Sequence, residues 1–329
     1  MKNAVNTDKR IGVYTLVRRV LVPVAAFFFI KVMFHYSSEF SQMEYSIDPL
    51  LFTAGSVLML VTYLYIALIW HLLTRQFGIR LPFRMSLLKW SVSQFARYIP
   101  GSIFVLASRL VDYNSYKSSK ERVTTSFLLE NVIVMLSVSC VFFMFGWSFI
   151  TDNTDFNILP YIVVVPVGVI VLTTGFPKWF TNKILGILKR KEITEWPRAA
   201  CMMKCLVLGL IAFLQSGFGF YLVILSIQPL DISNLPLVIG AYAGSGVVNL
   251  LVFFVPGGIG VRDGALAFFL SYMMPVPVAL LLSVVCRVVL TLSELLILLA
   301  AWFWCRIADS SNRRSAELQE SKWGERAGK

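Results

Sequence analysis

Long apolar stretches are the feature of this sequence that most constrains its fold. A helix needs about 20 mostly apolar residues to cross a lipid bilayer. Five stretches reach that length: Leu50 to Leu73, Val123 to Ile150, Ile158 to Phe176, Cys201 to Ile227 and Val276 to Cys305. A sixth, Val17 to Phe34, is marginal, and we interpret it as an uncleaved first span. Because backbone polar groups in lipid must be paired within the protein, these stretches predict an all-α integral membrane protein.

The positions of the basic residues predict the topology of the chain in the membrane. The net charge is +12. Most of the 30 Lys and Arg residues fall in segments 1–19, 74–96, 109–122, 177–200 and 306–329, whereas loops 35–49, 151–157, 228–234 and 271–275 contain none. By the positive-inside rule, both termini of this multi-pass chain are cytoplasmic, and we expect it in a bacterial cytoplasmic (inner) membrane. The basic charge reports topology and requires no nucleic-acid partner.

Two matching phrases interrupt the apolar segments 86–112 and 235–272. They read Tyr-Ile-Pro-Gly-Ser-Ile-Phe-Val at 98–105 and Phe-Val-Pro-Gly-Gly-Ile-Gly-Val at 254–261. Proline lacks the backbone donor that a helix requires, and glycine adopts dihedral angles that other residues avoid. Each phrase therefore predicts a broken helix. Breaks at corresponding places in two halves of a membrane protein are typical of transporter binding sites.

The charge pattern gives the two interrupted segments opposite orientations. Segment 86–112 is bounded by basic loops and thus begins and ends in the cytoplasm, whereas segment 235–272 begins and ends outside. We expect inverted-topology halves, 50–150 and 201–305, with about six full transmembrane helices and two re-entrant broken helical hairpins. There are up to eight hydrophobic crossings, because the charges leave open whether 235–272 is re-entrant or crosses twice.

The remaining segments lie outside the two halves. Residues 177–200 alternate basic and apolar side chains, which predicts an amphipathic interfacial helix on the cytoplasmic face. The basic cytoplasmic tail, 306–329, is polar and charged, and we expect it to be disordered. The membrane domain accordingly spans residues 12–305.

Charged residues within the apolar segments are the candidates for function, because an unpaired charge in hydrocarbon is costly. They are Arg97, Glu130, Lys204, Arg262, Asp263, Arg287 and Glu294. Lys204 is close enough to a span end to extend its charge into water. The others either bind a ligand or pair with one another as structural contacts. Glu130 and Glu294 are also candidates for carrying protons in ion-coupled transport.

The second break offers the chemistry of an anion site. Arg262 and Asp263 should occupy the first turn of a new half-helix, where free amides and the helix dipole favour an anion. Arginine presents a planar fork of donors, so a phosphate group is the natural ligand. Arg97 and Arg109 flank the first break in the corresponding role. The candidate substrate-binding residues are Arg97, Pro100, Gly101, Arg109, Glu130, Asn249, Pro256, Gly257, Gly258, Gly260, Arg262, Asp263, Arg287 and Glu294.

Small polar residues precede both breaks. Ser91, Ser93 and Gln94 come before the first break. Ser245, Gly246 and Asn249 come before the second. They either bind a headgroup through hydrogen bonds or allow helices to pack closely. The five cysteines and two histidines have no spacing typical of a metal site, and we expect neither a metal nor a cofactor.

Several of these phrases together resemble a known family. Arg-Tyr-Ile-Pro-Gly-Ser at 97–102, Leu-Glu at 129–130, Pro-Gly-Gly-Ile-Gly-Val-Arg-Asp-Gly-Ala at 256–265 and Arg287 are similar to the lysylphosphatidylglycerol synthase transmembrane region family, also called flippase-like. The resemblance covers roughly residues 12 to 305. It implies inverted units with re-entrant helices that move an aminoacylated phospholipid between leaflets. The soluble aminoacyl-transferase half is absent, so we expect no synthesis of lysyl-lipid by this chain.

The leading hypothesis is thus a lipid translocase, not an enzyme, that accepts an aminoacyl phospholipid or a polyprenyl-phosphate glycan carrier. Its partners would be membrane lipids with an anionic phosphate headgroup. A homo-oligomer or an association with a cell-envelope biosynthesis protein stays open. One alternative is a membrane-embedded enzyme acting on a lipid phosphate, and another is a non-transporting partner in a cell-envelope assembly.

Overall fold

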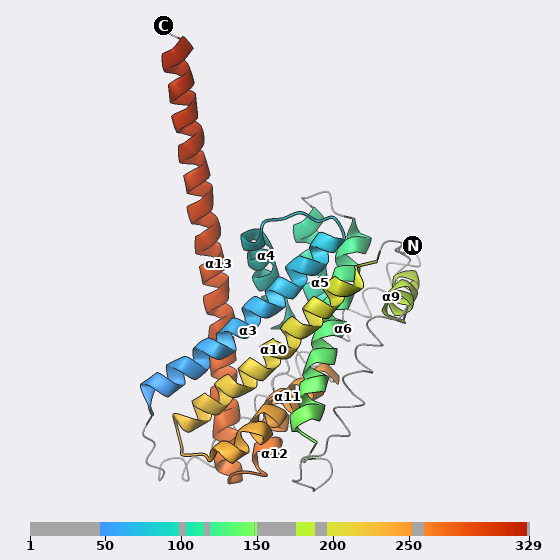
Figure 1. The fold of residues 1–329 in the computed structure, drawn as a ribbon, viewed down its shortest axis with the longest axis vertical. Coiled ribbons are helices and arrows are strands. Elements are labelled where there is room, and N and C mark those ends of the chain that lie inside the picture. The colour runs from blue at the N-terminus through green and yellow to red at the C-terminus, as the bar shows by residue number, and fades with distance from the viewer. Residues whose placement is uncertain are drawn as a thin grey trace, which may run out of the picture.

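The computed structural model describes residues 47–98, 103–114, 119–147, 149, 176–187, 196–251 and 260–327. Within them every regular element is a helix, which confirms the predicted class (Figure 1). Four helices are long and apolar enough to cross a membrane, and each coincides with a predicted span. They are α3 (Pro49–Gln76), α6 (Lys120–Phe145), α10 (Ala199–Leu225) and the first part of α13 (Val276–Ala327). The predicted span Val17 to Phe34 lies outside the described residues, as does the predicted span Ile158 to Phe176 apart from Phe176 itself.

Side-chain caps define where two of these helices begin. The Asp48 carboxylate accepts hydrogen bonds from the backbone amides of Leu50 and Leu51, at 2.9 and 3.2 Å, and so starts α3. The Ser119 hydroxyl accepts from the amide of Arg122 at 3.3 Å and starts α6. Each cap satisfies amides that have no partner within the helix.

Two pairs of shorter helices lie where the interrupted segments were predicted. The first segment consists of α4 (Phe83–Phe95), the 3₁₀ turn η1 (Ala96–Tyr98) and α5 (Ile103–Asn114). The second consists of η2 (Ile232–Asn234), α11 (Leu235–Leu251) and α12 (Val261–Leu270). Pro100, Gly101, Pro256, Gly257 and Gly258 lie outside the described residues. In Figure 1, α4 and α5 lie near the end of the bundle where α3 ends, and α11 and α12 lie near the opposite end.

Helices α3 and α10 pack along each other at the centre of the bundle and run in opposite directions (Figure 1). Glycines permit their close approach. A methyl group built on Gly55 would lie 2.4 Å from the carbonyl oxygen of Gly219, and one on Gly219 would lie 2.7 Å from that of Gly55. The two backbones therefore touch directly, as is common where small residues line a contact between membrane helices.

The remaining contacts repeat around this central pair. In the first half α4 packs against α3 and α5, and α5 packs against α6. In the second half α11 packs against α10 and α12, and α12 packs against α13. The contacts between halves correspond too, because α13 packs against α3 and α4 as α6 packs against α10 and α11. The first half and the second half are thus assembled in the same way.

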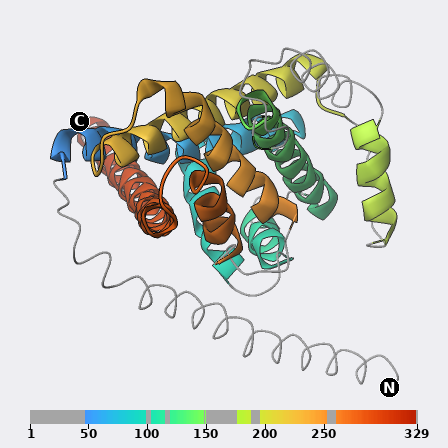
Figure 2. The ribbon, with the colours of Figure 1, turned by 90° about the horizontal axis from the view of Figure 1, so that it is seen from below.

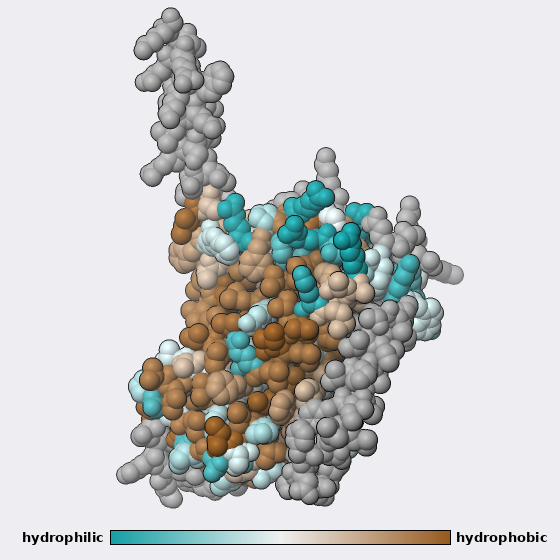
Figure 3. All heavy atoms as spheres, viewed as in Figure 1, coloured by the Kyte–Doolittle hydropathy of each residue, from teal (hydrophilic) through white to brown (hydrophobic). Residues whose placement is uncertain are grey.

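The basic segments in the described part of the chain gather at one end of the bundle. The end of α3, the start of α6, the start of α10 and the projecting end of α13 all lie at the upper end in Figure 1. In Figure 3 hydrophilic surface gathers at that end, and a broad apolar band follows below it. This arrangement matches the charge sorting read from the sequence.

Two segments extend from the bundle. Helix α9 (Phe176–Ile187) lies at its edge (Figure 2), with Thr181 and Leu185 buried and Trp179 and Phe180 exposed. Part of the predicted amphipathic segment 177–200 is therefore an amphipathic helix. The tail 306–329 is not disordered as predicted, because α13 continues as helix to Ala327. Arg, Ala, Glu, Leu, Gln and Lys dominate that tail and propagate a helix already started in the span.

Candidate functional site

The structure pairs most of the charges that lie within the apolar segments. Three ion pairs form among the described residues: Arg109 with Glu130, Arg97 with Glu294, and Arg287 with Asp263. The pairing interpretation thus holds for these six side chains. The three pairs differ in burial and surroundings, and these differences separate structural pairs from a candidate binding site.

The pair between Arg109 on α5 and Glu130 on α6 is enclosed on all sides. Arg109 is 1% exposed and Glu130 4%. The indole Nε1 of Trp90 donates to Glu130 Oε1 at 2.7 Å, and Arg109 donates to the same carboxylate and, from Nε, to Ser93 Oγ at 3.0 Å. The guanidinium also lies 4.0 Å from the ring centroid of Trp70.

A second layer of hydrogen bonds surrounds this pair. Trp70 Nε1 donates to the Tyr113 hydroxyl at 2.7 Å. At the next residue of α3, His71 Nδ1 lies 3.0 Å from Ser86 Oγ. This network joins α3, α4, α5 and α6, so Arg109 and Glu130 hold the first interrupted segment against its own half. The structure favours the structural interpretation over headgroup binding for both residues.

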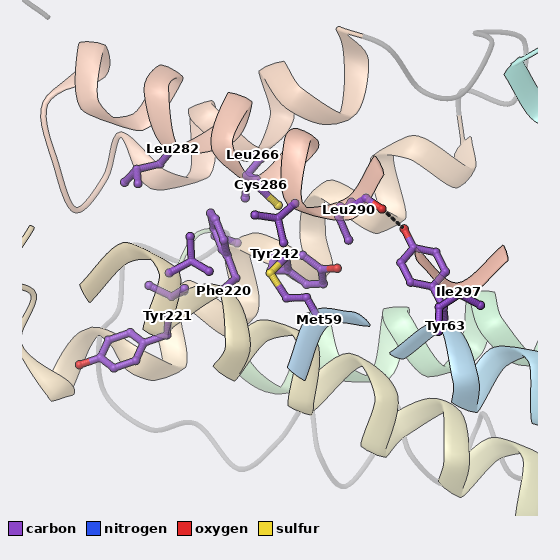
Figure 4. Packing of buried hydrophobic residues seen from close by; sticks show 14 of the residues in the cluster. Met59, Tyr63, Phe220, Tyr221, Tyr242, Leu266, Leu282, Cys286, Leu290 and Ile297 are labelled. Carbon is purple, nitrogen blue, oxygen red and sulfur yellow. Dashed lines mark hydrogen bonds between the residues drawn. The ribbon is translucent and has the colours of Figure 1, made fainter. Parts of the chain in front are cut away.

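The pair between Arg97 and Glu294 joins the two halves. Arg97 lies in η1, directly before the first break, and 34% of its side chain is exposed. Glu294 lies on α13 and is 5% exposed. The hydroxyl of Tyr63 on α3 donates to Glu294 Oε1 at 2.6 Å and lies 3.4 Å from the carbonyl oxygen of Leu290 (Figure 4). Three elements from both halves therefore meet at one carboxylate.

A narrow crevice lies beside this carboxylate. Its lining residues are Tyr63, Trp90, Ser91, Gln94, Glu294 and Ile297. Ser91 is 2% exposed, and its hydroxyl has no hydrogen-bond partner within the described residues. A buried hydroxyl without a partner is costly. As it stands, the crevice has no room for a water-sized molecule, so a ligand would meet the Ser91 hydroxyl only in a more open conformation. Ser91 and Gln94, two of the three polar residues before the first break, line this meeting point of the halves, whereas Ser93 accepts a hydrogen bond from Arg109.

Arg262 is the exception among the intramembrane arginines. It lies in the first turn of α12, as predicted, and forms no ion pair with a described carboxylate. Its Nε is buried and has no hydrogen-bond partner in the described part of the chain. The guanidinium lies over the ring of Tyr242, 5.2 Å from its centroid, and is within electrostatic range of Tyr63. Tyr63 is hydrogen-bonded to Glu294, so it interacts with the charges of both Arg262 and Glu294.

The residues around Arg262 define the start of α12. Gly260 has φ +83°, a conformation that favours glycine, and its amide donates to Asp263 Oδ2 at 3.1 Å. Asp263 Oδ1 lies 3.9 Å from an Arg287 nitrogen on α13. Asp263 thus caps the helix and pairs with Arg287, which makes the predicted anion site at this helix end depend on Arg262.

The other predicted residues contribute less to the site. Asn249 lies half-buried near the end of α11 and joins none of the clusters above within the described residues. The Ser245 hydroxyl donates to its own helix at the carbonyl of Tyr242, at 2.7 Å. A methyl group on Gly246 would lie 3.0 Å from Val138, which favours the packing interpretation for both small residues.

Sequence reasoning missed the aromatic residues with polar ends. Tyr63, Trp90 and Tyr242 are almost fully buried, and each places its polar group against a charged or polar partner. Their signal was a tyrosine or tryptophan in the middle of an apolar helix, because a buried hydroxyl or indole N–H needs a partner.

Within the described residues, no three His, Cys, Asp or Glu side chains converge on a point that could hold a metal ion. The chain matches no protein-family model and no curated protein. The family resemblance read from the sequence stays a prediction.

Proposed function

We propose that this chain is a lipid translocase of a bacterial inner membrane that moves a phosphate-bearing lipid between leaflets. The matched contacts of α3 to α6 and α10 to α13 support two inverted-topology halves. The positions of the shorter helices, at opposite ends of the bundle, support two re-entrant hairpins that approach each other from the two sides (Figure 1). Both termini are then cytoplasmic, because the basic segments share one end.

Arg262 is the observation that carries the proposal. A guanidinium at membrane depth is costly unless its charge and donors are compensated. The other three arginines discussed above each have a carboxylate partner, whereas Arg262 has none among the described residues and keeps a buried donor unpaired. A phosphate oxygen supplies both the negative charge and the acceptor. Arg262 is therefore a binding group for an anionic headgroup.

The crevice extends this site across the interface between the halves. Arg97, with 34% of its side chain exposed, pairs with Glu294 beside the crevice, and the unpaired Ser91 hydroxyl lies at the crevice wall. A headgroup at this position would meet both interrupted segments at once. The acyl or prenyl chains would stay in lipid. An aminoacyl phospholipid and a polyprenyl-phosphate glycan carrier both fit this chemistry, and the family resemblance favours the same class of activity.

Reconstitution tests the proposal directly. The purified chain is placed in phosphatidylcholine liposomes that contain fluorescent phosphatidylglycerol, and leaflet exchange is followed by quenching the outer leaflet with dithionite. We expect the native chain to accelerate exchange. Arg262→Ala should slow exchange by about tenfold or more, because a charge-assisted hydrogen bond contributes about 1.5–3 kcal/mol. The exchange rate of Arg262→Lys should lie between those of the native chain and Arg262→Ala, since lysine keeps the charge and lacks the planar fork of donors.

Arg306→Ala is the matched control. Arg306 is an exposed arginine on α13 that stacks on Trp302, 4.5 Å from its ring centroid, far along the helix from the crevice. Its removal should leave exchange unchanged. Exchange no faster than in empty liposomes, or equal rates for Arg262→Ala and the native chain, would contradict the proposal.

A further inference from the structure

The two buried glutamates differ in whether their surroundings accept a proton. Glu130 faces donors: Trp90 Nε1 at 2.7 Å and the guanidinium of Arg109. An indole N–H and a guanidinium have no acceptor atoms. A protonated Glu130 would have to turn a hydroxyl toward one of these donors. The contacts of Glu130 therefore offer no acceptor for a carboxyl hydrogen.

Glu294 faces a group that can reverse its hydrogen bond. The Tyr63 hydroxyl donates to Glu294 at 2.6 Å, and a second acceptor, the carbonyl oxygen of Leu290, lies 3.4 Å from the same hydroxyl (Figure 4). A hydroxyl both donates and accepts, and its hydrogen rotates to suit. With Glu294 protonated, Tyr63 can donate to Leu290 and accept from Glu294. The Tyr63 hydroxyl therefore has hydrogen-bond partners whether Glu294 is ionised or protonated.

The arginine partners of the two glutamates differ as well. Arg109 is 1% exposed, so no ligand reaches it without unpacking α5 from α6. Arg97 has 34% of its side chain exposed and lies next to the first break. An anion arriving at the crevice can therefore bind Arg97 and compete with Glu294 for the same guanidinium.

We infer that Glu294 takes up one proton when an anionic headgroup binds at Arg97, so that the chain binds lipid and proton together. The inference rests on the proposed function. A phosphodiester at Arg97 removes the charge that compensates the Glu294 carboxylate. An ionised carboxylate left in an apolar site is costly and neutralises instead. The carboxylate and a proton from solvent become a carboxylic acid. Arg97 is then paired with the phosphate in place of the Glu294 carboxylate, and the net charge of the site is unchanged.

The other groups around Glu294 are consistent with this role. Within the described residues, α4 presents uncharged side chains to the crevice, those of Trp90, Ser91 and Gln94. Helix α12 contributes Arg262 and Asp263, and Arg262 is within electrostatic range of Tyr63. On α13 itself Arg287 lies two turns earlier and pairs with Asp263. Arg97 is the cation that the described contacts place directly against Glu294, so we expect its occupancy by a headgroup to change the protonation of Glu294.

Titration calorimetry tests the coupling. The full chain in phosphatidylcholine nanodiscs is titrated with dihexanoyl phosphatidylglycerol, a phosphodiester that does not titrate near neutral pH, in two buffers of different ionisation enthalpy. Protein-free nanodiscs correct for partitioning. We expect uptake of about one proton per bound lipid, and a Kd that weakens by up to about tenfold per unit rise in pH, because binding linkage is reciprocal. Glu294→Gln should bind without proton uptake and with a pH-independent Kd.

One variant serves as the matched control. Glu121→Gln, in the first turn of α6, makes the same change outside both pairs and should keep the proton uptake of the native chain. Binding of phosphatidylglycerol without proton uptake, or equal uptake by Glu294→Gln and the native chain, would overturn the coupling and leave the phosphate site standing. No binding by the native chain would overturn both.

Discussion

At the scale of single residues, the protein uses arginine in two ways. Arg109 is saturated with partners and joins helices of one half, whereas Arg262 keeps a buried donor unpaired at the start of α12. The two arginines therefore have different roles. Their partners distinguish them, because a cation with a carboxylate beside it has little affinity left for a ligand.

Arg109→Ala should strongly destabilise the fold. The substitution leaves the Glu130 carboxylate buried without its cation, and breaking a buried ion pair in this way costs about 3–5 kcal/mol. We expect a large drop in the melting temperature of the purified chain in detergent. Adding Glu130→Gln should restore part of the loss, because the stranded charge is then gone.

Arg306→Ala is again the comparison for Arg109→Ala, since it removes an exposed arginine whose contact with Trp302 contributes about 0.5–1 kcal/mol. Equal melting temperatures for Arg109→Ala and Arg306→Ala would show that the enclosed pair does not stabilise the first half.

The sequence identifies the charged residues of the site but not their partners. Arg97 and Glu294 are 197 positions apart, and no local pattern connects them. The position of Arg262 after a glycine at the start of a half-helix is local, and it was predicted. The pairing of Arg109 with Glu130 depends on how α5 packs against α6, so sequence spacing could not separate it from a ligand site.

At the scale of the elements, the contact between α3 and α10 brings two helix backbones directly together. Gly55→Ala should destabilise the chain, because the new methyl group would lie 2.4 Å from the Gly219 carbonyl oxygen and would force the helices apart. Overpacking of this kind costs about 1–3 kcal/mol. The measurement is the fraction of chain that stays monodisperse in detergent after heating.

Gly186→Ala provides the matched comparison for Gly55→Ala. A methyl group on Gly186, in α9, meets no atom within 4 Å. Alanine is also a better helix former than glycine by about 1 kcal/mol, so this variant should be as stable as the native chain or slightly more. A loss of stability equal to that of Gly55→Ala would refute a specific contact at the helix crossing.

The helices were predicted correctly where the length of an apolar stretch determined them. The prediction failed for the tail, where the amino-acid composition fits both a disordered segment and a helix. The four spans follow from the length of their apolar stretches, and the helices beside the two breaks follow from Pro-Gly. The tail after Arg306 was predicted to be disordered because it has few apolar residues. Its residues are good helix formers attached to an existing helix, which removes the cost of nucleation.

At the scale of the whole molecule, the repeated contact pattern is the strongest support for inverted halves. Helices α3 to α6 and α10 to α13 make corresponding contacts, and the first shorter helix of each half, α4 or α11, packs against the last long helix of the other half. This packing couples the two halves, because neither interrupted segment can shift without moving a helix of the other half. No periodicity in the sequence encodes which half's helix each interrupted segment packs against.

Inverted halves make a definite prediction about sidedness. Arg80 and Ser119 are exposed and lie near the basic end of the bundle, whereas Ser233 and Tyr272 are exposed and lie in loops without Lys or Arg. Single cysteines at these four positions are treated with a membrane-impermeant maleimide in right-side-out and inside-out vesicles. The labelling of the native chain, with its five cysteines, is subtracted.

Ser233→Cys and Tyr272→Cys should label in right-side-out vesicles, and Arg80→Cys and Ser119→Cys in inside-out vesicles, because basic segments stay on the cytoplasmic side. The pair at 80 and 119 brackets the first interrupted segment, and the pair at 233 and 272 brackets the second. A segment whose two ends label from one side has not crossed the membrane overall. Labelling of positions 80 and 119 from opposite sides would make the first segment a full crossing, and the inverted arrangement would then be wrong.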